Sequence, residues 1–199
     1  MQLTLANRLT LLRVAIVPPL ALLVMIEAPA ARIVALLLFA LAAATDYLDG
    51  RIARARNEIT DLGRCLDPIA DKLLVATVLV ALVAADRAPW VPVLLIVLRE
   101  LGISGLREFL AGRGPSLPVT QLAKWKTTVQ MVALALLLVG DLVPFVQLTG
   151  EVLLWLAALL TVVTAVGYVR SAAAFLGIGT DPAPQPQKLS GRRAGNAKG

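Results

Sequence analysis

Four aspartates stand at fixed intervals in a chain that is otherwise strongly apolar. Asp46 and Asp49 are three residues apart, and Asp67 and Asp71 are four residues apart. On helices, both spacings place the members of a pair on one face. Ionised carboxylates are costly inside a bilayer, so a group of them within membrane helices indicates a functional site. Such hard oxygen ligands favour Mg²⁺, Mn²⁺ or Ca²⁺, and a two-metal site suits displacement at phosphorus.

Basic residues beside the aspartates allow an alternative in which they simply form ion pairs. These residues are Arg51, Arg54, Arg64 and Lys72. The attraction within a buried ion pair rarely compensates for removing both charges from water. Bound cations would also relieve the mutual repulsion of four carboxylates at low dielectric. We therefore favour a divalent metal site.

The composition is that of an integral membrane protein. Of the 199 residues, 58% are hydrophobic and only 16% are charged, against roughly 25% charged in soluble domains. The absence of His excludes His-based catalysis and His-ligated metals, and the single Cys65 cannot form an intrachain disulfide. The net charge of +6 reflects basic residues placed where cytoplasmic loops are expected. We therefore expect these residues to set topology and to bind phosphates or anionic lipid, with no nucleic-acid partner.

Six apolar stretches predict an all-α protein with six transmembrane helices. Their limits are residues 9–27, 31–54, 64–85, 88–110, 119–140 and 150–174. The first stretch imitates a secretory signal, but the chain stays hydrophobic to Val169, which favours an uncleaved first span. We assign residues 1–177 to one membrane domain and residues 178–199 to a disordered basic tail.

The distribution of Lys and Arg predicts the orientation. Of the 19 Lys and Arg residues, 17 lie in the second and fourth breaks, at the span ends facing them, or near the termini. The other three breaks hold only Arg32 and Arg87. By the positive-inside rule, both termini and the aspartate motif should face the cytoplasm.

The apolar runs of the second, third and fifth spans are too short to cross a bilayer alone. Each is 13 residues long, or about 20 Å of helix, whereas the hydrocarbon core is about 30 Å thick. The helices should therefore continue through their polar ends, which places the aspartates in the cytoplasmic half of the membrane with Arg99, Glu100, Lys124 and Lys126. Such groups should line a polar cavity open to the cytoplasm. Arg99 and Glu100 are adjacent and should point apart.

The pattern Asp-x2-Asp-Gly-x2-Ala-Arg-x8-Gly-x3-Asp-x3-Asp, at residues 46–71, resembles the signature of the CDP-alcohol phosphotransferases. The resemblance covers about residues 5 to 175. It implies transfer of a phosphoryl-alcohol group from a CDP-linked donor to a hydroxyl acceptor, with release of CMP. It also implies six membrane helices, two divalent ions (Mg²⁺ or Mn²⁺), a cytoplasm-facing site and a homodimer.

The resemblance assigns roles to individual residues. The implied metal ligands are Asp46, Asp49, Asp67 and Asp71, and Asp71 is also the implied base for the acceptor hydroxyl. The implied contacts to the CDP-linked donor are Asp49, Gly50, Ala53, Arg54 and Gly63. An acceptor that carries a phosphate needs cations in the cavity. The candidates for this role are Arg99, Arg107, Lys124 and Lys126.

Within the family, the flanking residues resemble the phosphatidylglycerophosphate synthases. The likeness rests on Asn7, Thr10, Arg13, Arg99, Glu100, Lys124 and the segments 66–72, 104–108, 126–132 and 140–141. Two departures are Ala6, where those enzymes often have Pro, and Ala123, where Gly is usual. The implied substrates are CDP-diacylglycerol and sn-glycerol 3-phosphate, and the implied location is the inner (cytoplasmic) membrane.

Two kinds of alternative remain open at this point. Another member of the family would keep the aspartate site but change the acceptor, as in cardiolipin synthesis from phosphatidylglycerol or transfer to an inositol-type alcohol. A cation transporter would use the carboxylates as an ion pathway. The clustering of the aspartates toward one side of the membrane, with Gly50 and Arg54 beside them, does not favour the transporter.

Overall fold

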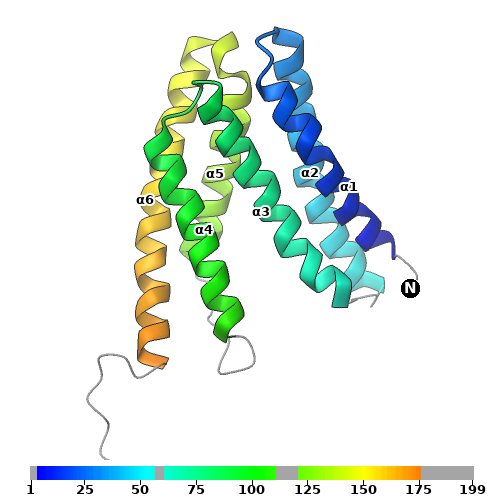
Figure 1. Cartoon of the computed structure of the whole chain (residues 1–199), viewed down its shortest axis with the longest axis vertical. Helices are drawn as coiled ribbons and strands as arrows, with labels where there is room; N and C mark the ends of the chain where they lie inside the picture. The colour runs from blue at the N-terminus through cyan, green and yellow to red at the C-terminus, as the bar shows by residue number, and fades with distance from the viewer. Residues whose placement is uncertain (1–3, 57–60, 111–120, 176–199) are drawn as a thin grey trace, which may run out of the picture.

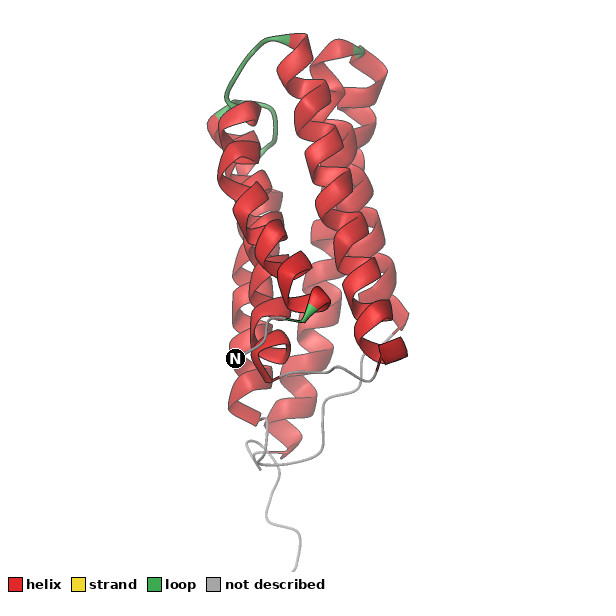
Figure 2. Ribbon diagram, turned by 90° about the vertical axis from the view of Figure 1, so that its right-hand side faces the viewer, coloured by secondary structure: helices red, strands yellow, loops and turns green. Residues whose placement is uncertain are grey.

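The computed structural model describes residues 4–56, 61–110 and 121–175, and these segments are almost entirely helical (Figure 2). The elements are α1 (Leu5–Val24), α2 (Pro29–Arg56), α3 (Asp61–Ala84), α4 (Trp90–Leu110), α5 (Gln121–Val139), the 3₁₀ helix η1 (Gly140–Leu142) and α6 (Pro144–Phe175). The predicted number of long helices is confirmed, and no strand occurs in the described segments. The predicted tail, residues 178–199, lies outside them.

The six long helices form two groups of three. In one group, α1 packs against α2 and α3, and in the other α6 packs against α4 and α5 (Figure 1). Contacts between the groups are fewer, and the largest share of them joins α2 to α5. We name these the N-terminal group and the C-terminal group. The start of α1, the end of α2 and the end of α6 lie at the same end of the molecule (Figure 1), as the alternating directions of six helices require.

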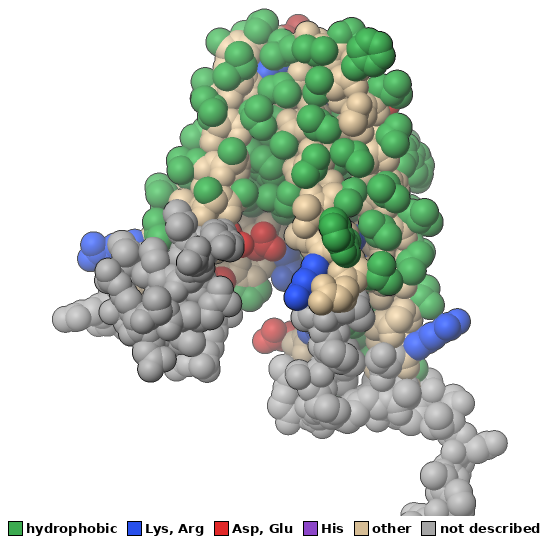
Figure 3. All heavy atoms as spheres, turned by 180° about the vertical axis from the view of Figure 1, so that it is seen from behind, with side chains coloured by type: hydrophobic (Ala, Val, Ile, Leu, Met, Phe, Trp, Pro, Cys, Tyr) green, Lys and Arg blue, Asp and Glu red, His purple; other side chains and the backbone are tan. Residues whose placement is uncertain are grey.

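Within the segments that the structure describes, four helices are long and apolar enough to cross a membrane. The apolar windows are Asn7–Val24, Pro29–Asp46, Lys124–Leu142 and Pro144–Arg170. Hydrophobic side chains cover the upper part of the face shown in Figure 3, and charged side chains gather toward the lower part. Large apolar side chains such as Leu22, Leu37 and Phe145 are exposed, as expected for a surface that faces lipid. The chain is therefore a multi-pass membrane protein.

The remaining two long helices, α3 and α4, have 24 and 21 residues but carry more charge. In α3 the charged residues include Asp67, Asp71 and Lys72, and in α4 they include Arg99 and Glu100. These are the residues that the sequence assigned to a site, or their neighbours. The charged residues of the predicted site therefore lower the hydropathy of α3 and α4, although both helices are as long as membrane-spanning helices.

Two helix boundaries bear on the sequence predictions. The expectation that α2 continues through its polar end is confirmed, because the helix runs to Arg56. The expected start of the last helix at residue 150 was wrong, because α6 begins at Pro144. Proline is well suited to the first position of a helix, where its missing N–H has no intrahelical partner to lose.

Arg87, in the connection between α3 and α4, links α1 to α5 at the end of the molecule opposite the aspartates. Its side chain is buried, and its Nη2 atom donates to the carbonyl oxygens of Leu137 at 3.0 Å and Leu138 at 2.5 Å. Its Nη1 atom donates to the carbonyl oxygen of Val24 at 3.4 Å. These carbonyls lie near the ends of α5 and α1, where the helices leave acceptors unsatisfied. Arg87 therefore joins the N-terminal and C-terminal groups.

Asp141 of η1 adds ion pairs to this link between the two helix groups, which we call the Arg87 tie. Its carboxylate lies 2.9 Å from Arg87 Nε and 2.9 Å from Arg32 Nη2. Burial lowers the pKa of Arg87, and the charge of Asp141 opposes that change. Gln147 of α6 donates to the backbone oxygen of Arg87 at 3.1 Å. The two basic residues that the sequence placed on the far side of the membrane thus share one carboxylate.

Candidate active site

One face of α1 holds two of the predicted aspartates from two different helices. Arg13 is fully buried, and its Nη1 atom lies 2.8 Å from Asp46 Oδ1 of α2. Thr10, one turn earlier, donates from Oγ1 to Asp67 Oδ1 of α3 at 2.7 Å. Thr10 and Arg13 share a face because they are three residues apart on a helix. The sequence marked these two residues only as part of the family resemblance, and their contacts with the aspartates appear only once α1 packs against α2 and α3.

Asp71 lies one turn beyond Asp67 on α3. The charges of Asp46, Arg13, Lys72 and Glu100 lie near enough to influence Asp71, and Asp71 shares a cavity with Glu100 and Lys126 of the C-terminal group. The neighbouring Lys72 donates to the carbonyl oxygen of Pro68 at 3.2 Å. Asp71 is therefore the predicted aspartate that connects the two parts of the site.

The three described aspartates fit part of a site for hard cations. The side chain of Asp49, the fourth predicted ligand, lies outside the described residues. Among the side chains that are described, no three carboxylates or thiols form a group that could hold a metal ion. The donor chemistry agrees with Mg²⁺ or Mn²⁺, and the complete set of ligands needs Asp49.

The predicted donor-binding residues are placed by their backbones. Gly50, Ala53 and Arg54 lie on α2 at helical spacings of three or four residues from Asp46 or from one another, which favours a common face. The side chains of Ala53 and Arg54 lie outside the described residues, as does the surface exposure of Gly50. Gly63 is buried near the start of α3. The structure thus supports the helical positions of these residues and leaves their contacts as predictions.

Two of the predicted acceptor cations share one carboxylate of α4. Glu100 Oε1 pairs with Lys126 of α5 and with Arg99 Nη1, the latter at 3.1 Å. The expectation that Arg99 and Glu100 point apart was therefore wrong. Adjacent Cβ atoms do diverge on a helix, but a long arginine side chain can bend back far enough to bring its guanidinium to the neighbouring carboxylate.

Tyr168 of α6 contacts two arginines of α4. Arg107 Nη2 donates to the tyrosine hydroxyl at 3.1 Å, and its guanidinium carbon lies 5.0 Å from the ring centroid. The guanidinium carbon of Arg99 lies 5.6 Å from the same centroid. Both distances fall within the roughly 6 Å typical of cation–π contacts. Tyr168 therefore positions two of the predicted acceptor cations, a role that the sequence did not indicate.

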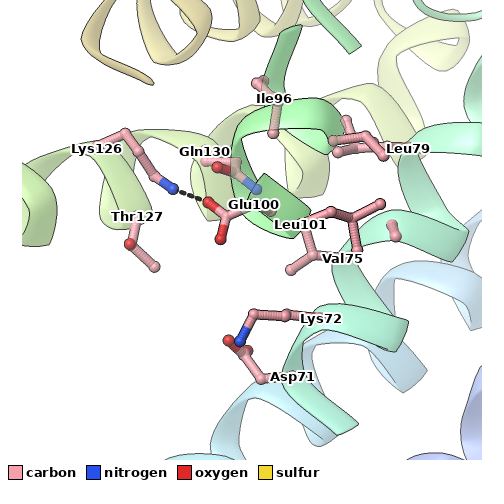
Figure 4. A pocket seen from close by; sticks show the side chains of 12 residues that line it. Asp71, Lys72, Val75, Leu79, Ile96, Glu100, Leu101, Lys126, Thr127 and Gln130 are labelled. Carbon is pink, nitrogen blue, oxygen red and sulfur yellow. Dashed lines mark hydrogen bonds and ion pairs between the residues drawn. The ribbon is translucent and has the colours of Figure 1, made fainter. Parts of the chain in front are cut away.

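A cavity of about 60 Å³ lies between α3, α4 and α5. Its polar lining residues are Asp71, Lys72, Glu100, Lys126, Thr127 and Gln130, and its other walls are mainly apolar (Figure 4). The cavity thus joins the predicted base to a predicted acceptor cation across the boundary between the two helix groups. Lys124, two residues before Lys126, is exposed.

Comparison with known proteins gives a consistent result. Residues 3–163 match the family model described as CDP-alcohol phosphatidyltransferase. A protein of Rickettsia bellii is 46% identical over 170 residues, covering 84% of this chain and 94% of its own. An Escherichia coli protein is 39% identical over 180 residues, covering 88% and 98%. A Bacillus subtilis protein is 37% identical over 175 residues, covering 80% and 90%. All three relatives are named CDP-diacylglycerol–glycerol-3-phosphate 3-phosphatidyltransferase.

Proposed function

This chain belongs to the CDP-alcohol phosphatidyltransferase family, and from that premise we propose that it is a phosphatidylglycerophosphate synthase. It transfers the phosphatidyl group of CDP-diacylglycerol to sn-glycerol 3-phosphate, giving phosphatidylglycerophosphate and CMP in phospholipid biosynthesis. The observation that carries this function is the likeness over most of the chain to relatives that share one enzyme name. The positions of Asp71 and Lys126 on one cavity agree with it.

The reaction is a displacement at the phosphorus that carries diacylglycerol. The acceptor hydroxyl attacks this phosphorus, the bond to the CMP oxygen breaks, and Asp71 takes the hydroxyl proton. Asp46, Asp49, Asp67 and Asp71 would hold two Mg²⁺ or Mn²⁺ ions, which would neutralise charge on the diphosphate. Arg13 and Thr10 fix the orientation of two of these carboxylates. Gly50, Ala53, Arg54 and Gly63 would contact the CDP moiety.

The acceptor phosphate would bind among the cations of the C-terminal group. Arg99, Arg107, Lys124 and Lys126 outnumber the single carboxylate of Glu100 that pairs with two of them. A phosphate dianion suits this excess of positive charge. Because Glu100 compensates part of the charge of Arg99 and Lys126, we assign much of the phosphate attraction to Lys124 and Arg107.

Lys124→Ala is expected to raise the KM for sn-glycerol 3-phosphate by at least about 10-fold, because hydrogen bonds to charged groups contribute about 1.5–3 kcal/mol. The KM for CDP-diacylglycerol should change little. Steady-state kinetics with each substrate varied in turn measure both constants, and the lipid donor serves as the internal reference. Equal increases in both KM values would remove Lys124 from the acceptor site.

The proposed orientation follows from the distribution of charge. All six long helices would cross the inner membrane, with both termini and the cavity on the cytoplasmic side. The charged groups of α3 and α4 are compatible with crossing because Asp71 and Glu100 line a cavity rather than the lipid-facing surface. Assembly into a homodimer stays a prediction.

The proposed function is tested by CMP release from the purified protein with CDP-diacylglycerol and Mg²⁺, with and without sn-glycerol 3-phosphate. Release that requires sn-glycerol 3-phosphate and stops on addition of a chelator is the expected result. Release only with phosphatidylglycerol or an inositol-type alcohol would keep the family and change the acceptor. No CMP release with any of these alcohols, together with cation flux in vesicles, would favour the transporter instead.

A further inference from the structure

Gln130 of α5 is a buried amide with an unused acceptor. The residue is only 3% exposed, and its Oε1 atom has no hydrogen-bond partner among the residues that the structure describes. A buried acceptor left without a hydrogen bond is destabilising, because it loses its bonds to water and gains none in the protein. Most buried polar groups are satisfied, so this atom needs an explanation.

The position of Gln130 places this acceptor on the reaction cavity. It follows Lys126 by four residues on α5, so the two side chains share a face, and both line the cavity with Asp71 and Glu100. Figure 4 shows Gln130 and Lys126 next to Glu100, with Asp71 farther along the lining of the same cavity. The cavity volume of about 60 Å³ exceeds the roughly 10–15 Å³ that one water requires, so there is room for a small polar group.

We propose that Gln130 recognises the hydroxyl of the acceptor that does not react. This inference rests on the proposed function. The acceptor sn-glycerol 3-phosphate carries a reacting hydroxyl at one end, a phosphate at the other, and a second hydroxyl on the carbon between them. With the reacting end at Asp71 and the phosphate at the cations of α4 and α5, the middle hydroxyl can donate to Gln130 Oε1.

This contact would make Gln130 a specificity residue rather than part of the chemistry. The middle hydroxyl neither attacks phosphorus nor leaves, so its hydrogen bond selects the acceptor. A site built to bond a hydroxyl discriminates against an analogue that lacks it, because its own buried polar group then remains unpaired. Gln130 would thus recognise the middle hydroxyl, while the cations of α4 and α5 bind the phosphate of the same small molecule.

The test compares sn-glycerol 3-phosphate with 3-hydroxypropyl phosphate, which has the same reacting hydroxyl and phosphate but no middle hydroxyl. The wild-type protein should prefer sn-glycerol 3-phosphate by at least about 10-fold in kcat/KM. Gln130→Met removes the acceptor while keeping a long unbranched side chain, and should reduce that preference to near unity. The ratio for one protein sample does not depend on the fraction that is folded.

Two further variants sharpen the result. Gln130→Glu retains an acceptor oxygen and should retain most of the preference. Gln147→Met, which removes an amide from the Arg87 end of the molecule, should leave the preference unchanged. An unchanged preference in Gln130→Met would overturn the inference while leaving the proposed function intact. Failure of the wild-type protein to use sn-glycerol 3-phosphate would instead overturn the proposed function itself.

Discussion

Asp67→Asn is expected to lower the rate of CMP release by more than about 100-fold while the protein keeps its fold. The amide oxygen of asparagine can still accept the hydrogen bond from Thr10 Oγ1, so the link between α1 and α3 survives. The substitution removes the charge with which Asp67 would bind a divalent cation. The loss should therefore exceed the roughly 10–100-fold typical of residues that only orient a metal ligand. CMP release by protein that is monodisperse in detergent measures it.

Thr10→Val is the matched variant, because it removes the hydrogen bond to Asp67 and keeps the carboxylate. Its activity should fall by about 10–100-fold, and higher Mg²⁺ concentrations should restore part of it. The same Mg²⁺ increase should not rescue Asp67→Asn. Rates like those of the wild type in Asp67→Asn would end the hypothesis that Asp67 binds metal.

Arg87→Met is expected to destabilise the protein by about 3–5 kcal/mol, which is typical of breaking a buried ion pair from one side. The variant loses the bonds to the carbonyls of Val24, Leu137 and Leu138 and one of the two described ion pairs of Asp141, the other being with Arg32. The midpoint of thermal unfolding in detergent should fall by about 10 °C or more. Near-normal acceptor preference is expected at low temperature, because Arg87 lies at the end away from the cavity.

The comparison variant for this second prediction is Arg32→Met. It removes an ion pair with the same carboxylate but leaves the bonds between Arg87 and the helix ends in place. Its unfolding midpoint should fall by clearly less than that of Arg87→Met. Equal midpoints for the two variants would show that the carbonyl bonds of Arg87 do not hold the helix groups together.

The membrane class and the six helices could be predicted from the sequence because hydropathy depends on composition over long windows. The position of the aspartates on helices was also accessible, since their spacing repeats at helical intervals. The start of α6 was misplaced because the segment from Asp141 to Gly150 was predicted to be a polar break, whereas Pro144 can begin a helix. The contact between Arg99 and Glu100 was missed because it depends on the path of a flexible side chain.

Other parts of the site depend on contacts between helices that no local pattern encodes. The roles of Thr10 and Arg13 arise only when α1 packs against both α2 and α3. Tyr168 lies about 60 residues from Arg107 in the chain and meets it only through the packing of α4 on α6. In the sequence, nothing distinguishes Gln130 from other polar residues. Its burial and the lack of a described hydrogen-bond partner for its Oε1 atom appear only in the structure. Asp49 and its neighbours on α2 remain predicted from spacing and resemblance.

The division of the molecule into two helix groups has a consequence for divergence among related enzymes. The proposed donor and metal residues lie on the N-terminal group, and the proposed acceptor residues lie on the C-terminal group. After gene duplication, substitutions on α4 and α5 can therefore select a new acceptor alcohol. The N-terminal group, which would bind the CDP-linked donor, stays under unchanged selection. The bonds of Arg87 to both helix groups would keep their relative position unchanged while such substitutions accumulate. Laboratory evolution toward new acceptors should accordingly draw its beneficial mutations mainly from α4 to α6.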